Sequence, residues 1–158
     1  LNDIVARAFA SAGIPAVKEP NGLTRLDGKR PDGLTLIPWK AGKPLTWDVT
    51  VSSTLAASYV ESTSQTAGAA AELADIRKSA KYADLEMSYV FQPLAFENLG
   101  PMNESAIKFF SELGQKISSV TGDNLECRFL FQRLSISVQR FNAILLHDSF
   151  ILSDKLRI

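Results

Sequence analysis

The sequence predicts an α/β fold in which helices flank a small mixed sheet. Two apolar, β-prone runs at 34–39 and 45–51 enclose a tight turn and predict a β-hairpin. A helical pattern over 69–87 then precedes a further strand over 89–96, where Pro93 indicates a sheet edge or a bulge. Strands that alternate with helices in this way are typical of α/β proteins.

Helices are also predicted over 2–12, 103–120 and 124–146, and a short strand over 16–19. Asn2 or Asp3 is suited to capping the first of these helices, and Gly122 follows the end of the second. We expect the two C-terminal helices to pack as an antiparallel pair and the tail from Ser149 to be disordered.

The predicted domain organisation is a core over 1–100 and a helical extension over 101–158 that packs on it, forming one compact domain overall. A chain of 158 residues is long enough for one such domain. Because the sequence begins at Leu1 instead of Met, we expect it to be part of a longer protein.

Composition excludes several function classes. Lys and Arg number 17 and Asp and Glu number 17, so no net charge attracts nucleic acid or membrane as a whole. The chain has one cysteine, Cys127, and one histidine, His147, which excludes a disulfide scaffold and zinc sites of the usual kind. No apolar run approaches the roughly 20 residues of a membrane span.

The predicted hairpin sets the positions of two acids. A three-residue loop at Lys40-Ala41-Gly42 would pair Pro38 with Pro44, and the same register places Asp32 opposite Thr50. Because strand side chains alternate between faces, Asp32, Asp48 and Thr50 would then share one face. A loop one residue longer or shorter would move Asp32 to the other face.

Two carboxylates on one face of a sheet are suited to a divalent cation. Asp48 lies within the apolar run Trp47–Val51, where a carboxylate is costly unless it is paired or bound to metal. Magnesium favours one or two carboxylates together with water and phosphate oxygens. The sequence alone leaves two other readings open: Asp32 as a turn residue, and Asp48 in an ion pair with Arg30 or Lys43.

A longer series of four segments occurs along the chain in this order: Arg30-Pro31-Asp32, Trp47-Asp48-Val49-Thr50-Val51, Arg77-Lys78-Ser79-Ala80-Lys81-Tyr82 and Phe91-Gln92-Pro93-Leu94. The series resembles the restriction-endonuclease-like, PD-(D/E)XK-type domain found C-terminal to reverse transcriptase in site-specific non-LTR retrotransposon proteins. The resemblance covers 16–97, and it departs from the pattern at Thr50, where the motif has a lysine.

The resemblance implies a restriction-endonuclease-like sandwich and a magnesium- or manganese-dependent endonuclease that nicks target DNA. It implies a reverse transcriptase in cis, DNA as the partner, no membrane, and a nuclear, reducing location. The following roles are carried over by position: metal ligation by Asp32, Asp48, the Val49 carbonyl and Glu19; catalytic assistance by Lys78, Lys81 and Tyr82; nucleic-acid binding by Arg30, Thr50 and Lys43.

The alternative function is a catalytically inactive nuclease fold that binds nucleic acid or protein, because Thr50 carries no charge. Each carried-over residue also has a structural reading. Glu19 suits a solvated strand end, the two lysines suit a helix surface, and Tyr82 suits the edge of the core.

Helix geometry raises a specific question about the two lysines. The apolar stripe Leu73–Met87 is predicted to face the sheet, and at 100° per residue Lys78 lies about 160° to 200° from it. Lys78 would then point to solvent, and Lys81, near the edge of the stripe, would be closer to the site. Sequence alone does not choose between them.

Two other features have a functional and a structural reading. Residues 52–68 are rich in Ser, Thr and Ala, which suits a surface loop or a lid over a substrate. Arg133 and Arg140 are seven residues apart and share a helix face, which suits a solvated surface or contacts to a phosphate backbone.

Overall fold

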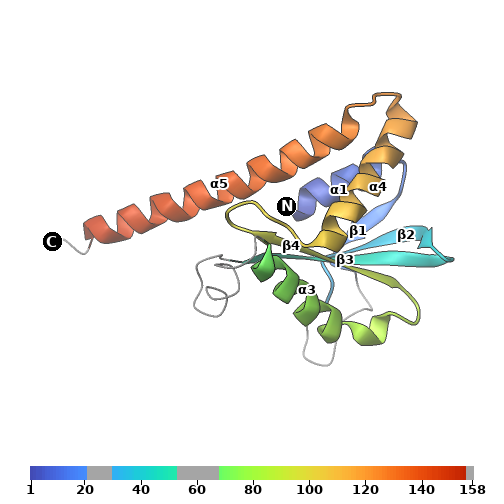
Figure 1. The fold of residues 1–158 in the computed structure, drawn as a ribbon, viewed down its shortest axis with the longest axis horizontal. Helices are drawn as coiled ribbons and strands as arrows, with labels where there is room; N and C mark the ends of the chain where they lie inside the picture. Colours follow the sequence, from blue (N-terminus) through green and yellow to red (C-terminus); the bar gives the residue numbers. More distant parts are fainter. Residues whose placement is uncertain (21–29, 53–67, 156–158) are drawn as a thin grey trace.

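The computed structural model describes residues 1–20, 30–52 and 68–155 (Figure 1). Helices and strands follow one another as the sequence predicts, with a short 3-10 helix, η1, before the last strand. The elements are α1 (Asn2–Ser11), β1 (Ala16–Lys18), β2 (Gly33–Lys40), β3 (Lys43–Ser52), α3 (Ala69–Lys81), η1 (Ala83–Leu85), β4 (Val90–Glu97), α4 (Glu104–Thr121) and α5 (Glu126–Lys155).

The strands form one four-stranded mixed sheet in the order β1-β2-β3-β4, which confirms the α/β prediction. The first two neighbouring pairs are antiparallel, whereas β3 and β4 are parallel. A parallel pair needs a crossover connection, and α3 lies in the segment that joins these two strands. Pro93 lies in β4, an edge strand, where its missing N–H costs no sheet hydrogen bond.

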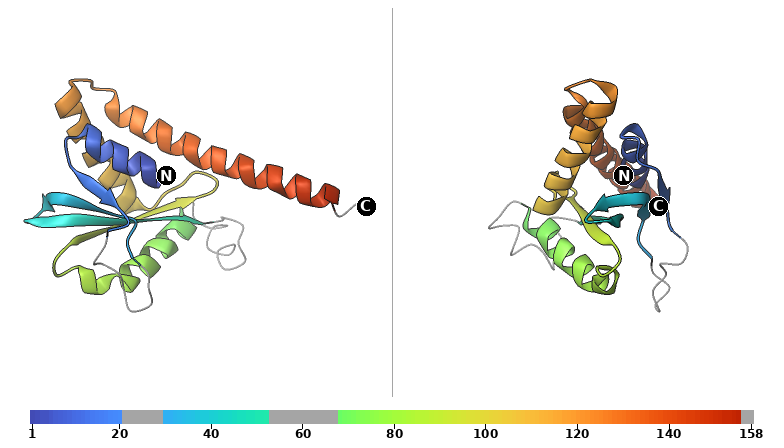
Figure 2. Two further views of the ribbon diagram at one scale, coloured as in Figure 1. Left: turned by 180° about the vertical axis from the view of Figure 1, so that it is seen from behind. Right: turned by 90° about the vertical axis from the view of Figure 1, so that its right-hand side faces the viewer.

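Helices cover the two faces of the sheet unequally. α3 lies on one face, and α1, α4 and α5 lie on the other (Figures 1 and 2). The main hydrophobic core is on the three-helix face. It includes Phe9 of α1, Trp47 of β3, Phe110 of α4 and Leu134 of α5, none of which exposes any surface. The C-terminal helices therefore share one core with α1 and the sheet.

The other face of β3 is polar. Thr46, Asp48 and Ser52 are buried on it, under α3, between the apolar side chains that alternate with them. Among the residues that the structure describes, the buried apolar cluster on this face is small and is formed by Ala71, Ala74 and Ala95. Small side chains let α3 approach the sheet closely over this polar strand face.

The hairpin between β2 and β3 is tighter than predicted. Its turn has two residues, Ala41 and Gly42, with φ of 53° and 73°, and Lys40 pairs with Lys43. Such primed turns match the twist of the flanking strands. The expected three-residue loop is therefore wrong, although the predicted pairing of Pro38 with Pro44 is confirmed.

The register also slips further along the hairpin. Irregularities between Leu34 and Lys40 place Leu34 opposite Thr46 and Gly33 opposite Trp47, two positions from the prediction. Gly33 is needed there, because a Cβ atom would lie 1.9 Å from the Trp47 indole. Asp32 consequently lies beside Trp47 and Asp48, and not opposite Thr50. A slip of two residues preserves which face each side chain takes.

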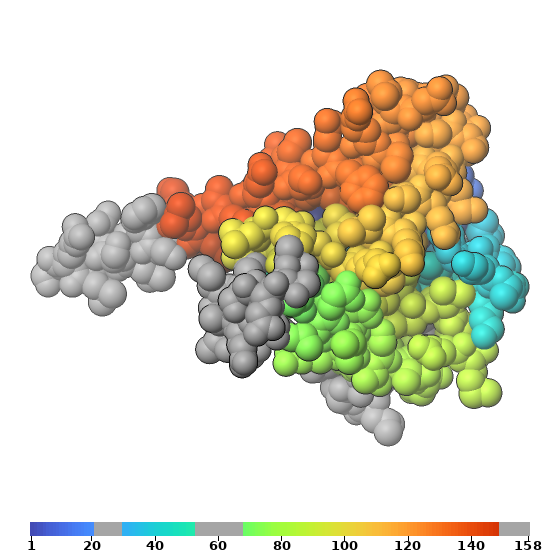
Figure 3. Space-filling model, viewed as in Figure 1, coloured from blue at the N-terminus to red at the C-terminus, as the bar shows by residue number. Residues whose placement is uncertain are grey.

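The helix ends differ from prediction at two places. The helix expected over 69–87 ends at Lys81 and is followed by η1. The helix expected over 124–146 continues to Lys155, so the prediction of a disordered tail from Ser149 is wrong. No glycine or proline follows Gly122 to interrupt α5. Figure 3 shows α5 running beyond the rest of the described chain.

Two further expectations concern the segment 52–68 and membrane spans. The surface-loop and lid readings of 52–68 lie almost wholly outside the described residues, which resume at Gly68. Within the described ranges, no helix is both long enough and apolar enough to cross a membrane.

Candidate active site

Asp32 is fixed by hydrogen bonds on several sides. Its N–H donates to the Trp47 carbonyl (2.9 Å), and its carbonyl accepts from the Glu19 N–H (2.8 Å). Its carboxylate Oδ2 accepts from the Val49 N–H at 2.7 Å. Two of these partners, Trp47 and Val49, flank Asp48 on β3, so the structure brings the two predicted acids into one small region.

Asp48 is buried and paired with a lysine from another element. The residue is 4% exposed. Its Oδ2 lies 2.6 Å from Lys78 Nζ of α3. Among the described residues, that oxygen receives no hydrogen bond of good geometry, so the contact is an ion pair. Sequence reasoning considered Arg30 or Lys43 as partners of Asp48, and neither is.

The surroundings of Asp48 oppose its charge. Burial is the largest cause and raises the pKa of Asp48 above its ordinary value. The Asp32 carboxylate raises the pKa further, whereas Lys78, and to a smaller extent Lys81, lower it. A second cation at this position would therefore relieve a repulsion that one lysine does not cancel.

The face that α3 presents to the sheet answers the question about the lysines. Ala71 and Ala74 are buried, and Lys78 continues the same face one turn later. The predicted stripe is wrong, since Ile76 is 65% exposed and Met87 is 87% exposed. The alanine face packs because the sheet below it is polar and closely approached, so Lys78 reaches the site instead of solvent.

Lys81 and Tyr82 lie at the end of the same helix. Lys81 Nζ is 5.1 Å from the centroid of the Tyr82 ring, a cation–π contact. Tyr82 is 1% exposed, and its ring packs against Phe91 at 4.9 Å between centroids. This burial contradicts a direct contact between Tyr82 and a phosphate and supports packing under the lysine.

The remaining charged candidates are not brought to the carboxylates. Arg30 forms an ion pair with Glu19 at 3.1 Å, and the Glu19 side chain is 66% exposed. Glu19 contacts Asp32 through its backbone N–H, while its carboxylate pairs with Arg30. Lys43 lies at the hairpin turn and donates to the Glu86 carbonyl at 3.0 Å, so it does not pair with Asp48.

The oxygen donors at the site suit a hard cation, although they are few. Thr50 Oγ1 is buried and, within the described chain, has no hydrogen-bond partner. The N–H and the C=O of a strand residue point to the same side, so the Val49 carbonyl is directed toward Asp32. No group of three or more His, Cys, Asp or Glu side chains in the described ranges could hold a metal. Two carboxylates and a carbonyl are within the range that magnesium accepts when water completes its shell.

Two residues that support the site were not predicted to do so. Asn2 accepts a hydrogen bond from Trp47 Nε1 (2.7 Å) and donates to the Asp32 carbonyl (3.3 Å), so it holds β3 and Asp32 together. It was considered only as a helix cap, and no local signal distinguishes the two roles. Glu97, which is 1% exposed, accepts from the Ala71 N–H at 3.1 Å and fixes the start of α3.

A polar network holds the middle of α3 against β4 and α4. Asp75 accepts hydrogen bonds from Asn103 Nδ2 (2.8 Å) and Ser105 Oγ (3.1 Å). Asn103 also accepts from the Ala95 N–H at 2.9 Å. Because α3 is fixed at both Asp75 and Ala71, the position of Lys78 one turn further along is well determined.

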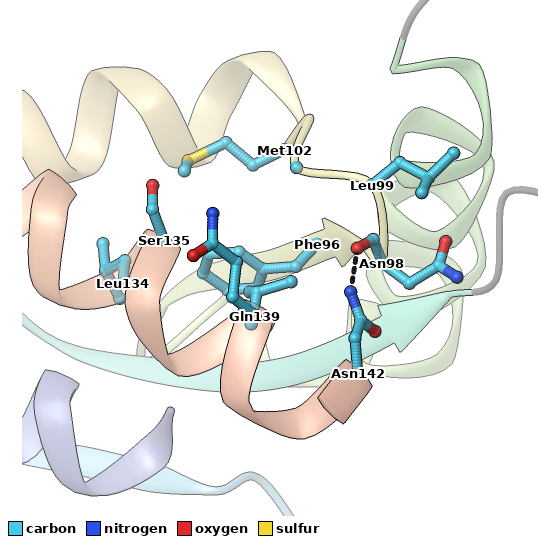
Figure 4. A pocket seen from close by; sticks show the side chains of 10 residues that line it. Phe96, Asn98, Leu99, Met102, Leu134, Ser135, Gln139 and Asn142 are labelled. Carbon is cyan, nitrogen blue, oxygen red and sulfur yellow. Dashed lines mark hydrogen bonds between the residues drawn. The ribbon is translucent and has the colours of Figure 1, made fainter. Parts of the chain in front are cut away.

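A separate hollow lies on the three-helix face, between α5 and the connection from β4 to α4 (Figure 4). Its volume is about 300 Å³. Asn142 donates to the Asn98 carbonyl across it. None of its lining residues is ionisable, so it offers no acid, base or metal ligand. It is lined by Phe96, Asn98, Leu99, Gly100, Met102, Leu134, Ser135, Val138, Gln139 and Asn142.

Comparisons with known proteins add no constraint. The chain matches no protein-family model, no curated protein and no solved structure.

Proposed function

We propose that this chain is a magnesium- or manganese-dependent DNA endonuclease with a restriction-endonuclease-like core, a module of a retroelement reverse-transcriptase polyprotein. The convergence of Asp32, Asp48 and Lys78 carries the proposal. These residues come from three separate segments, and Lys78 Nζ contacts Asp48 although the strand position that usually supplies the lysine holds Thr50. A lysine supplied from the following helix is what the resemblance implies.

The chain's own groups have separable roles in this proposal. Asp32, Asp48 and the Val49 carbonyl would hold the cation, which would polarise a phosphodiester and lower the pKa of a bound water. Lys78 places a positive charge where negative charge develops on the phosphate. The hydrogen bond from Val49 to Asp32 keeps the first carboxylate in place, so little reorganisation is needed when substrate binds.

The second candidate is a nuclease fold that binds nucleic acid or protein without cleaving it. One observation favours it: Lys78 is already paired directly with Asp48, and the described chain offers no third metal-ligating side chain. In that case the ion pair serves only to neutralise a buried acid. The two candidates differ in whether the chain binds a divalent cation and cleaves DNA.

The test is nicking of a supercoiled plasmid in magnesium or manganese, with wild type beside Asp48→Asn. We expect nicking to fall by on the order of 10²-fold or more in the variant, since a charged ligand is lost from the reaction site. Asp84→Asn, at an exposed position on η1, removes one charge elsewhere and should nick like wild type.

Unchanged nicking by Asp48→Asn would rule out the proposed site. If wild type does not nick, calorimetry with manganese separates the candidates. Manganese binding that Asp48→Asn abolishes indicates a formed site that needs other parts of the protein. Absence of binding in both leaves the second candidate.

A further inference from the structure

A hollow between α1 and α5 brings together three arginines from two helices. Its volume is about 420 Å³, and Arg7 of α1 lines it together with Arg133 and Arg140 of α5. All three residues are exposed. Figure 2 shows α1 beside α5 on the face of the sheet opposite α3. An adjoining hollow of about 360 Å³ shares Arg7 and Arg133.

The arginines have few direct partners within the described chain. None of the three forms an ion pair or hydrogen bond there, in contrast to Arg30 and Lys78. Asp3 lines the same hollow and forms an ion pair with Lys18, and the charge of Arg7 contributes to lowering the pKa of Asp3. Glu126 lines the adjoining hollow and is the other acid of this surface. Positive charge therefore predominates locally, although the whole chain is neutral.

The spacing of the arginines suits a chain of phosphates. Arg133 and Arg140 are seven residues apart on one helix, a rise of about 10 Å. Three nucleotide steps along one DNA strand, from one phosphate to the third after it, rise by about the same distance along the duplex. Guanidinium groups donate two parallel hydrogen bonds to phosphate, so arginine is well suited to such contacts.

This hollow is also connected to the candidate active site. Leu1 lines the hollow, and the next residue, Asn2, donates to the Asp32 carbonyl. The hollow is therefore one residue away from a contact with the Asp32 backbone, on the three-helix face of the sheet, whereas Asp48 is buried on the α3 face. Ile4 and Ile136 line the hollow between the arginines and provide apolar contacts for sugars.

We infer that Arg7, Arg133 and Arg140 form a binding track for the phosphate backbone of the nucleic acid that the active site cleaves. That this nucleic acid is the substrate depends on the proposed function, whereas its binding to the three arginines does not. Backbone contacts of this kind carry no sequence information, so the track would position substrate and leave target choice to other determinants.

The test is equilibrium binding of a short fluorescein-labelled DNA duplex, measured by anisotropy in EDTA over a range of salt concentrations. The triple variant Arg7→Gln, Arg133→Gln and Arg140→Gln should bind at least about tenfold more weakly at low salt. Its slope of log affinity against log salt should be smaller by about 3, or about 1 for each phosphate contact. The matched control replaces Lys40, Lys108 and Arg128 by Gln, which removes the same charge from other exposed positions.

Equal loss in both triple variants, no loss in either, or no binding by wild type would overturn the inference. So would competition by polyglutamate as strong as that by DNA, because the surface would then select acidic polymers in general. Plasmid nicking by the same proteins separates this inference from the proposed function. A track variant that binds weakly, beside an Asp48→Asn variant that still nicks, supports the track and rejects the metal site.

Discussion

Asp48 is a buried carboxylate that forms an ion pair with Lys78 and is repelled by the Asp32 carboxylate. Its raised pKa shows that burial and Asp32 outweigh the lysine. A buried ion pair of this kind is weak evidence for stability, because removing two charges from water is costly. The pair is therefore not accounted for by the stability that it gives to the fold.

The raised pKa of Asp48 predicts a specific pH dependence of stability. Below the ordinary value of 3.8, Asp48 is protonated in both folded and unfolded chains. Above it, the unfolded chain loses the proton first, so the contribution of Asp48 to stability is lost as pH rises through the folded pKa. Asp48→Asn does not titrate. Its free energy of unfolding relative to wild type should therefore increase with pH, by about 1.4 kcal/mol for each unit of the pKa shift.

Urea denaturation of both proteins in EDTA, from acidic to neutral pH, measures this difference. Asp84→Asn controls for the removal of one charge from an exposed position. If the free energies of unfolding of wild type and Asp48→Asn follow parallel curves against pH, the pKa of Asp48 is not raised. If Asp48→Asn loses stability relative to wild type as pH rises, the pKa of Asp48 is lowered instead.

Among the elements, α4 was predicted well and α3 was not. Asn103 and Gly122 flank α4, and both signals are local: a polar residue before the helix and a glycine in the left-handed conformation after it. The face of α3 depends on what lies beneath it. Periodicity assumes that the largest apolar residues are buried, but the strand below carries Asp48 and admits only alanines.

At the candidate site, too, features set by neighbouring residues were predicted, and features set by contacts far apart in sequence were not. Asp32 and Asp48 were identified from sequence, and their proximity survived a register slip of two residues. The slip itself could not be predicted, because Gly33 is required by the distant Trp47 indole and not by its neighbours. The choice of Lys78 over Lys81 likewise required the position of α3, which Glu97 and Asp75 fix through contacts far apart in sequence.

The orientation of α3 predicts different effects for its two lysines. Lys78→Met should reduce plasmid nicking by on the order of 10² to 10³-fold, as expected when a charge that faces the reacting phosphate is lost. Lys81→Met should reduce it by less than about tenfold, because Lys81 lies over the Tyr82 ring and only weakly affects Asp48. Nicking rates under saturating metal provide the comparison.

Loss of Lys78 also leaves Asp48 unpaired, so stability must be separated from catalysis. The double variant Asp48→Asn and Lys78→Met removes both charges of the pair and should recover stability without activity. A larger effect of Lys81→Met than of Lys78→Met would show that Lys81 is the assisting residue.

At the scale of the whole molecule, the sheet separates two different environments. The three-helix face holds the large apolar core, and the α3 face holds the buried polar residues and the candidate active site. The arginine hollow lies on the first side, yet α1 links it to Asp32 through Asn2. The stability of the core and the chemistry of the site are thus assigned to opposite faces of one sheet.

The shared core predicts that the C-terminal helices do not unfold separately. Leu134 of α5 is fully buried against α1, α4 and the sheet, whereas Ile144, further along the same helix, is 60% exposed. Leu134→Ala should lower the free energy of unfolding by about 2–5 kcal/mol. Ile144→Ala should change it by less than about 0.5 kcal/mol.

Urea denaturation followed by both tryptophan fluorescence and circular dichroism measures both values. Trp39 and Trp47 lie outside the C-terminal helices, so coincident transitions mean that sheet and helices unfold together. An earlier transition in circular dichroism alone would show that α4 and α5 form a separate unit.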